Sequence, residues 1–211
     1  VGILCVPNKT ASMYVEQVCD FDTTSRMDCD LGLPTTLIVR DPVSWYISGY
    51  RHCVNPDWQR THSSYGAHGA EDFAGHLEKC LRRRQLAARG SIEITPFDFH
   101  SWMNCRYQAQ GLYYELSDDQ NYQPRAPLNV QRTVKLEDTE TFENVVKLFS
   151  GKTHIDKQHH NQNSRSDYPR LTPHCQRLLH ELDDWSHSVG YNLADSIDSW
   201  RIKHDGNICN Q

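Results

Sequence analysis

Apolar residues follow two different spacings along this chain, and the alternation between them predicts an α/β fold. Short apolar or β-favouring runs predict buried strands over 1–6 and 35–39. The alternation of apolar and polar residues over 91–95 predicts a short strand, and a further strand is expected over 130–136. Apolar residues at helical spacing predict helices over 13–18, 70–84, 142–149 and 171–189, and one that begins at Pro42. The stretch 99–114 is expected to be mainly helical and 117–127 to be a loop. Because strands alternate with helices, we expect a mostly parallel central sheet with helices on both faces.

The most informative stretch is the predicted strand 35–39 with the residues that follow it. Arg40 stands directly after the strand, and ligands of open α/β sheets bind at the carboxyl ends of strands. Ser48 follows eight residues later, about two helical turns along the next helix. An arginine and a hydroxyl in this relation can hold a phosphate group. Taken alone, the stretch is better explained by an arginine that pairs with Asp41 or caps a carbonyl.

A second strand–loop–helix unit opens the chain. The strand 1–6 is followed by a loop that contains Lys9, Thr10 and Ser12, and then by the helix 13–18. Backbone N–H groups at a helix start, together with the charge of Lys9, form a cradle for an anion. This is not the glycine-rich nucleotide loop, because no glycine lies between Gly2 and Gly32. An ordinary N-capped helix is the alternative explanation.

Taken together, the two units resemble the sulfotransferases that use 3′-phosphoadenosine 5′-phosphosulfate, most closely their membrane-bound carbohydrate branch. Residues 9–12, Lys-Thr-Ala-Ser, resemble the loop that binds the 5′-phosphosulfate in that family. Arg40-Asp41-Pro42, with Ser48 and Tyr50-Arg51, resembles its 3′-phosphate motif. In two departures from the family pattern, Asn8 is inserted before Lys9 and Met13 replaces a threonine.

Later segments resemble the same family in the same order along the chain. They are Lys135-Leu136-Glu137-Asp138, the loop 159–164, and the helix from 171 that ends before Gly190-Tyr191. The resemblance implies a P-loop-like sulfotransferase fold in a single domain, 1–211, with a core over about 1–193 and a C-terminal tail over about 194–211. It also implies a donor site without a metal ion. The residues of that site are Lys9, Thr10, Ala11, Ser12, Arg40, Ser48, Asn161, Ser164 and Arg165.

Sulfuryl transfer requires a base that takes the proton of the acceptor hydroxyl, and Lys9 is expected to stabilise the leaving phosphate. In the family the base is a histidine or a carboxylate, often between the two phosphate motifs. That interval contains no histidine here, and its acids are Glu16, Asp20, Asp22, Asp28 and Asp30. Asp20 and Asp22, just beyond the first helix, are the preferred candidates, and His52 and His100 are the alternatives beyond the second motif. Solvated acids in a loop explain Asp20 and Asp22 equally well.

Composition adds the cellular context. A formal net charge of −5 gives no indication of nucleic-acid binding. Eight widely spaced cysteines suit disulfides in an oxidising compartment, although Cys5 is expected to be a buried thiol in the first strand. Because the chain begins at Val1, we expect that a targeting or membrane segment has been removed from it. The Golgi lumen or another part of the secretory pathway is the expected location.

Three functions are compatible with these patterns. The first is a sulfotransferase that acts on an acceptor hydroxyl, with a carbohydrate as the expected acceptor. The second is a kinase-like phosphoryl-transfer enzyme, although such an enzyme is expected to carry the glycine-rich loop that is absent here. The third is a binding module that keeps the fold without catalysis, an alternative left open by Met13 and the missing histidine.

Overall fold

A computed structural model of the chain describes residues 3–6, 12–19, 24–25, 34–53, 72–88, 113–116, 122–125, 130–154, 168–183 and 186–204. The chain forms two compact units, and each unit is assembled from stretches that are distant in sequence. The first unit comprises Val1–Asp41, His100–Ser117 and Tyr122–Ser164. The second comprises Pro42–Phe99, Asp118–Asn121 and Arg165–Gln211. The expectation of one domain over the whole chain stays a prediction.

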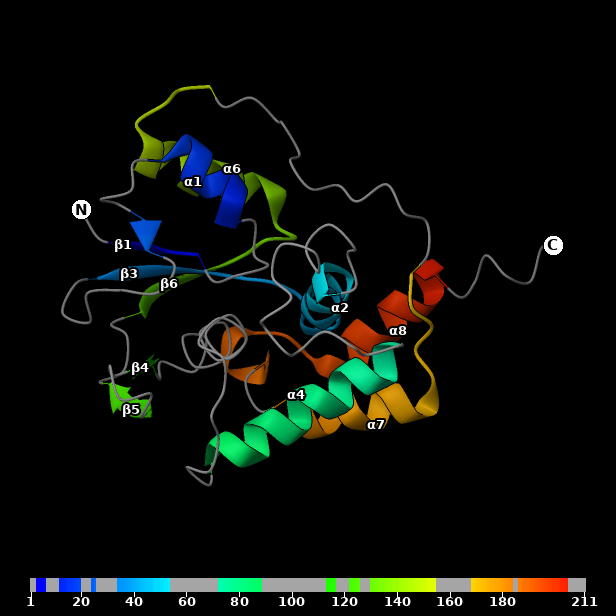
Figure 1. Ribbon diagram of the computed structural model, residues 1–211. Coiled ribbons are helices and arrows are strands. Elements are labelled where there is room, and N and C mark those ends of the chain that lie inside the picture. The colour runs from blue at the N-terminus through cyan, green and yellow to red at the C-terminus, as the bar shows by residue number, and fades with distance from the viewer. Residues whose placement is uncertain are drawn as a thin grey trace. The chain divides into compact units, whose positions relative to one another are not determined.

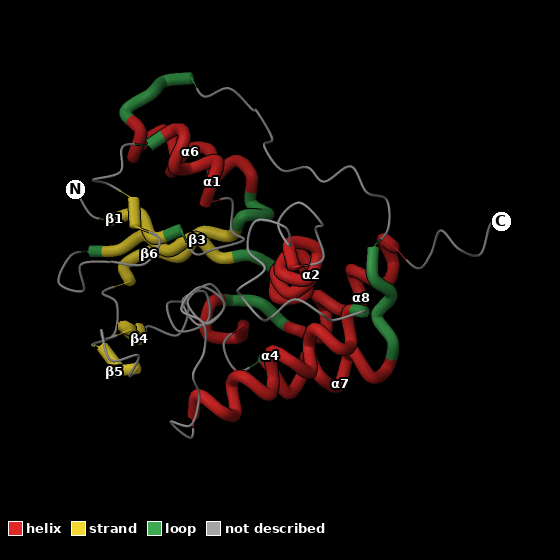
Figure 2. Tube along the Cα trace, in the orientation of Figure 1, coloured by secondary structure: helices red, strands yellow, loops and turns green. Residues whose placement is uncertain are grey.

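The first unit is an α/β unit built on a parallel sheet. Its elements are β1 (Ile3–Cys5), α1 (Ser12–Val18), β2 (Thr24–Ser25), β3 (Thr35–Val39), β4 (Tyr113–Leu116), β5 (Tyr122–Arg125), β6 (Val130–Lys135) and α6 (Thr139–Ser150). The main sheet has the strand order β2-β1-β3-β6, and all neighbouring strands in it are parallel. Strands β1, β3 and β6 of this sheet are labelled in Figures 1 and 2. β4 and β5 form a separate antiparallel pair. The α/β class predicted from the alternating spacing is confirmed.

The register of the sheet brings the carboxyl ends of its strands to one edge. Leu37 of β3 is paired with Cys5 of β1 on one side and with Thr133 of β6 on the other. β1 is flanked by β2 and β3, so the strand order reverses at β1. Such a reversal is the switch point at which open α/β sheets bind ligands.

Alternating side chains of the sheet belong to its two faces. Leu4, Ile38 and Val134 belong to one face, where they pack with apolar side chains of α1 and α6. The helix residues in this core are Val15, Cys19, Phe142, Val145 and Val146. α1 and α6 lie side by side over this face (Figure 1). On the opposite face, Leu37 and Val39 are buried as well. Both faces of the sheet are therefore covered, the first by helices α1 and α6.

Local signals set the ends of α6. The carboxylate of Asp138 caps its first turn by accepting a hydrogen bond from the Thr141 N–H at 3.2 Å. Gly151 ends the helix in the left-handed conformation, with φ of 67°. The helix predicted over 142–149 is confirmed, and these caps extend it at both ends.

The second unit is helical over its described residues. Its elements are α2 (Pro42–Cys53), α4 (Phe73–Ala88), α7 (Pro173–Leu182), the 3₁₀ helix η2 (Ser186–Val189) and α8 (Leu193–His204). α4 packs against α7, and α2 contacts both α4 and α8. Pro173 begins α7, where its missing N–H costs no helical hydrogen bond. Among the helices that the structure describes, none is long and apolar enough to cross a membrane.

Three local predictions differ from the structure. Tyr113 and Tyr114 belong to a strand rather than a helix, because aromatic residues favour extended pairing. The predicted loop 117–127 contains β5, and its Pro124 is tolerated because an outer strand has one edge without ladder partners. The helix predicted over 171–189 is interrupted at Asp183, whose carboxylate accepts hydrogen bonds from the backbone and hydroxyl of Ser186.

Two further expectations concern the segment beyond 193 and the strand over 91–95. The segment beyond 193, expected as a tail, begins with α8, and Leu193 and Ile197 of this helix are buried. The strand predicted over 91–95 lies outside the described residues.

Candidate functional site

The candidate site is the carboxyl edge of the parallel sheet in the first unit. β3 ends at Val39, and the half-buried Arg40 follows it directly. The neighbouring parallel strand, β1, ends at Cys5. The next helix, α1, begins at Ser12. The predicted position of Arg40 at the end of a central strand is therefore confirmed.

The turn after β6 contacts the turn after β3 at this edge. The Leu136 N–H donates a hydrogen bond to the Val39 carbonyl at 2.8 Å. The Asp41 N–H donates one to Oε1 of Glu137 at 3.0 Å. A hydrogen bond from the Asp138 N–H to the Lys135 carbonyl, at 3.1 Å, closes the turn that carries Leu136 and Glu137. The two connections thus form one hydrogen-bonded unit.

The contacts of Asp138 favour its ionised form. The hydrogen bonds from Thr141 lower the pKa of this carboxyl, and Arg132 lowers it further. Asp138 therefore caps α6 as a carboxylate at neutral pH. Glu137 and Asp138 are both exposed, so the edge presents acidic groups beside Arg40.

Ser48 belongs to α2 in the second unit, because the boundary between the units falls between Asp41 and Pro42. Ser44, Ser48 and Arg51 follow helical spacing and share a half-buried face of α2. The guanidinium carbon of Arg51 lies 4.8 Å from the ring centre of Tyr168, a cation–π arrangement. Two members of the predicted 3′-phosphate motif are thus polar residues on one helix face.

Tyr50, the neighbouring motif residue, packs between aromatic rings. Its ring centre lies 5.6 Å from that of Phe73 and 5.7 Å from that of His76. Burial raises the pKa of the Tyr50 hydroxyl, and the nearby charge of Asp72 raises it further. Tyr50 therefore remains neutral at physiological pH and joins α2 to α4.

Several predicted site residues lie outside the described ranges. They are Lys9, Thr10, Ala11, Asp20, Asp22, Asn161, Ser164 and Arg165. Ser12 begins α1 and His52 lies in the last turn of α2, but their side chains are not among those described. The roles predicted for these residues stay predictions.

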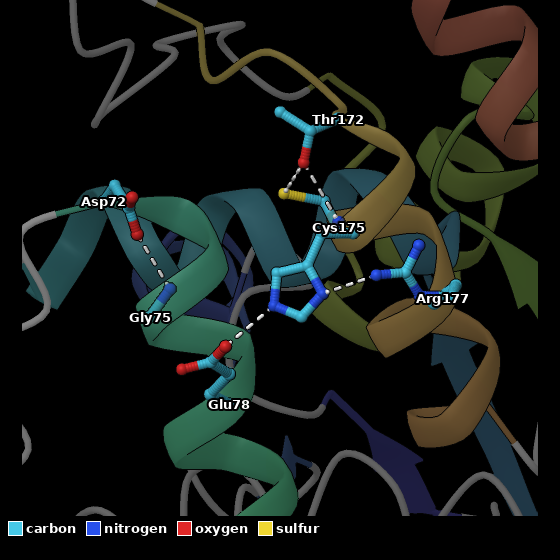
Figure 3. A network of polar contacts seen from close by, with 7 residues as sticks. Asp72, Gly75, Glu78, Thr172, Cys175 and Arg177 are labelled. Carbon is cyan, nitrogen blue, oxygen red and sulfur yellow. Dashed lines mark hydrogen bonds and ion pairs between the residues drawn. The ribbon is translucent and has the colours of Figure 1, made fainter.

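A polar network that the sequence did not indicate joins α4 to α7 (Figure 3). Nε2 of His174 lies 2.7 Å from Oε1 of Glu78. Nη2 of Arg177 lies 3.2 Å from Nδ1 of His174. Because arginine only donates, Nδ1 of His174 accepts the hydrogen bond from Arg177, and the Nε2–H donates a hydrogen bond to the Glu78 carboxylate. The partners are 96 residues apart, so no local pattern predicts the pair.

The four cysteines whose side chains the structure describes are thiols. Cys5, Cys19 and Cys175 are buried and Cys80 is half-buried, which confirms the prediction of a buried thiol at Cys5. The remaining cysteines are Cys29, Cys53, Cys105 and Cys209. The predicted disulfides stay a prediction. Within the described ranges, no group of three or more His, Cys, Asp or Glu residues is placed to hold a metal ion.

Comparisons with protein-family models, with curated proteins and with solved structures found no match to this chain. A functional assignment therefore depends on the residues themselves and on the sheet that positions them.

Proposed function

We propose that this chain transfers a sulfuryl group from 3′-phosphoadenosine 5′-phosphosulfate to a hydroxyl group, with a carbohydrate as the acceptor. The observation that carries the proposal is the switch point between β1 and β3. Arg40 follows β3 at this point, and residues 9–12 belong to the segment that joins β1 to α1. The parallel pairing of these strands supports a site in which both phosphate motifs serve one ligand.

Each phosphate of the donor has its own set of residues in this proposal. Arg40 binds the 3′-phosphate through its planar guanidinium, and Ser48 adds a hydroxyl. Lys9, Thr10, Ala11 and Ser12 bind the 5′-phosphosulfate through side chains and through backbone N–H groups that precede α1. Asn161, Ser164 and Arg165 complete the nucleotide site. The 3′-phosphate distinguishes this donor from an ordinary adenine nucleotide.

The chemistry is an in-line displacement at sulfur. The acceptor oxygen forms a new bond to sulfur while the bond from sulfur to the bridging phosphate oxygen breaks, and the electron pair stays on the phosphate. Lys9 stabilises that leaving phosphate, and a base takes the proton of the acceptor hydroxyl. Asp20, Asp22 and His52 are the candidates for this base. Positioning and charge stabilisation are expected to dominate, as in phosphoryl transfer.

The proposal includes the finer fold and the location implied by the same motifs. A P-loop-like sulfotransferase fold agrees with the parallel sheet and with α1 and α6 on one of its faces. Carbohydrate sulfation of this kind belongs to the Golgi lumen, which suits the number of cysteines in the chain.

A binding experiment tests the donor site. Isothermal titration is expected to show that 3′,5′-diphosphoadenosine binds more tightly than adenosine monophosphate, because only the first carries a 3′-phosphate. Arg40→Ala should weaken binding of the diphosphate by ~1.5–3 kcal/mol, the value of a charged hydrogen bond. The same substitution should leave binding of the monophosphate unchanged.

Equal affinity of the wild-type chain for the two nucleotides would contradict the proposal. Transfer of label from the sulfated donor to a panel of glycan, tyrosyl and phenolic acceptors then tests turnover. Tight binding of the diphosphate without transfer to any acceptor would identify a binding module instead of an enzyme.

A further inference from the structure

Arg40 is bounded by two peptide groups that are each held by the turn after β6. The preceding peptide contains the Val39 carbonyl, which accepts a hydrogen bond from the Leu136 N–H at 2.8 Å. The following peptide contains the Asp41 N–H, which donates to Oε1 of Glu137 at 3.0 Å. The first of these bonds continues the β3–β6 ladder, whereas the second depends on a single side chain.

We propose that Glu137 is a positioning residue that directs Arg40 toward the 3′-phosphate of the donor; this inference rests on the proposed function. When the peptide planes on both sides of a residue are held, its φ and ψ are fixed, and so is the direction of its Cα–Cβ bond. Glu137 thus restricts the direction in which the Arg40 side chain leaves the backbone. A preorganised arginine binds a phosphate with less loss of conformational freedom.

The turn that carries Glu137 is itself held in place. The Asp138 N–H bonds to the Lys135 carbonyl at 3.1 Å, and the Asp138 carboxylate caps α6. α6 is anchored in the core by Phe142, Val145 and Val146. The turn that carries Glu137 is therefore attached to a helix that is anchored in the core of the first unit.

The electrostatic effect of Glu137 opposes its positioning effect. Glu137 is a carboxylate close to the proposed anion site, so its charge alone repels a phosphate. Removing the charge should strengthen anion binding, whereas removing the tether to Asp41 should weaken it. The sign of the change in affinity therefore separates the two roles.

Three variants make use of this difference. Glu137→Ala removes both the negative charge and the hydrogen bond to Asp41. Glu137→Gln removes the charge but keeps an oxygen that can accept this bond. Asp138→Asn removes the neighbouring charge and keeps a side chain that can cap α6. We expect only Glu137→Ala to weaken binding of 3′,5′-diphosphoadenosine, by about 3- to 10-fold, the value of one hydrogen bond. The other two variants should bind as tightly as the wild type, or more tightly.

A readout without ligand tests the tether itself. Amide hydrogen exchange at Asp41 should be slow in the wild type and in Glu137→Gln, and faster in Glu137→Ala. Thermal unfolding identifies any variant that fails to fold. Wild-type affinity and unchanged Asp41 exchange in Glu137→Ala would each overturn the positioning role.

The design separates this inference from the function on which it rests. If Arg40→Ala loses discrimination between the diphosphate and the monophosphate but Glu137→Ala does not weaken binding, the inference fails and the function stands. If the wild-type chain does not discriminate, the function fails, and Asp41 exchange still reports whether Glu137 holds the turn. In the Arg40→Ala background, Glu137→Ala should no longer weaken binding, because there is no arginine left to position and only the repulsive charge is removed.

Discussion

Tyr50 shows how one side chain of a predicted binding motif is used for packing. Its ring lies against Phe73 and His76, and its pKa is raised by burial and by Asp72. The hydroxyl is neutral when protonated, so the folded chain favours the protonated form more than the unfolded chain does. The contribution of Tyr50 to folding stability is complete below pH 10.0, the ordinary pKa of tyrosine. It is lost as pH rises through the higher pKa of Tyr50 in the folded chain.

Tyr50→Phe tests this coupling. Phenylalanine keeps the ring contacts and removes the ionisable hydroxyl, so the variant should lose less stability above pH 10.0 than the wild type. Denaturant unfolding measured across the alkaline range checks the expectation. Parallel losses in the two proteins would show that Tyr50 does not contribute to the alkaline transition.

The sequence predicts the position of Arg40 but not its partners. Three apolar residues, Leu37, Ile38 and Val39, indicate a buried strand, and a strand end is a local feature. The bond from Asp41 to Glu137 joins residues 96 positions apart. It depends on the pairing of β3 with β6, and no pattern in a single sequence specifies which strands are neighbours. Lys9, Thr10, Ala11, Asn161, Ser164 and Arg165 lie outside the described ranges, and the ligand roles of all the predicted site residues stay predictions.

Among whole elements, strongly patterned ones agree with their predictions. α1 and α6 have apolar residues at helical spacing, and β3 and β6 are short apolar or β-favouring runs. β4 and β5 have mixed composition, and their pairing with each other gives them a structure that local preference does not indicate. α7 ends early for a similar reason, because the bonds between Asp183 and Ser186 compete with the helix.

Gly151, the cap residue after α6, and Gly49, inside α2, should respond to alanine in opposite ways. Gly151 ends α6 with φ of +67°, a conformation that costs alanine about 1 kcal/mol although no atom lies within 4 Å of an added Cβ. Gly49 lies inside α2, where an added Cβ would make an ordinary 3.7 Å contact with Nε2 of His76. Gly49→Ala should stabilise the helix by roughly 0.5–1 kcal/mol.

Chemical denaturation of the two variants measures the difference. Gly151→Asn is the matched control, because asparagine tolerates the left-handed conformation better than alanine. The backbone argument would be contradicted if Gly151→Ala had the same free energy of unfolding as the wild type, or if Gly49→Ala had a lower one.

At the scale of the whole molecule, the proposed ligand should stabilise the folded chain. A nucleotide that binds only the folded state adds about 2.7 kcal/mol at a concentration 100 times its dissociation constant. 3′,5′-Diphosphoadenosine should therefore raise the unfolding temperature, and adenosine monophosphate at the same concentration should raise it less. Scanning calorimetry provides the measurement, with Arg40→Ala as the control that should lose the difference. An equal shift with both nucleotides would oppose a 3′-phosphate site.

The strand order also has a consequence for synthesis of the chain. β3 has β1 on one side, but its other neighbour, β6, follows only at Val130–Lys135. At ribosomal rates of about 5–20 residues per second, the 96 residues from Val39 to Lys135 take roughly 5 to 20 seconds to appear. During that time one hydrogen-bonding edge of an apolar strand has no partner strand, which is a condition that favours aggregation. We therefore expect the nascent chain to be most prone to aggregation before β6 has been synthesised.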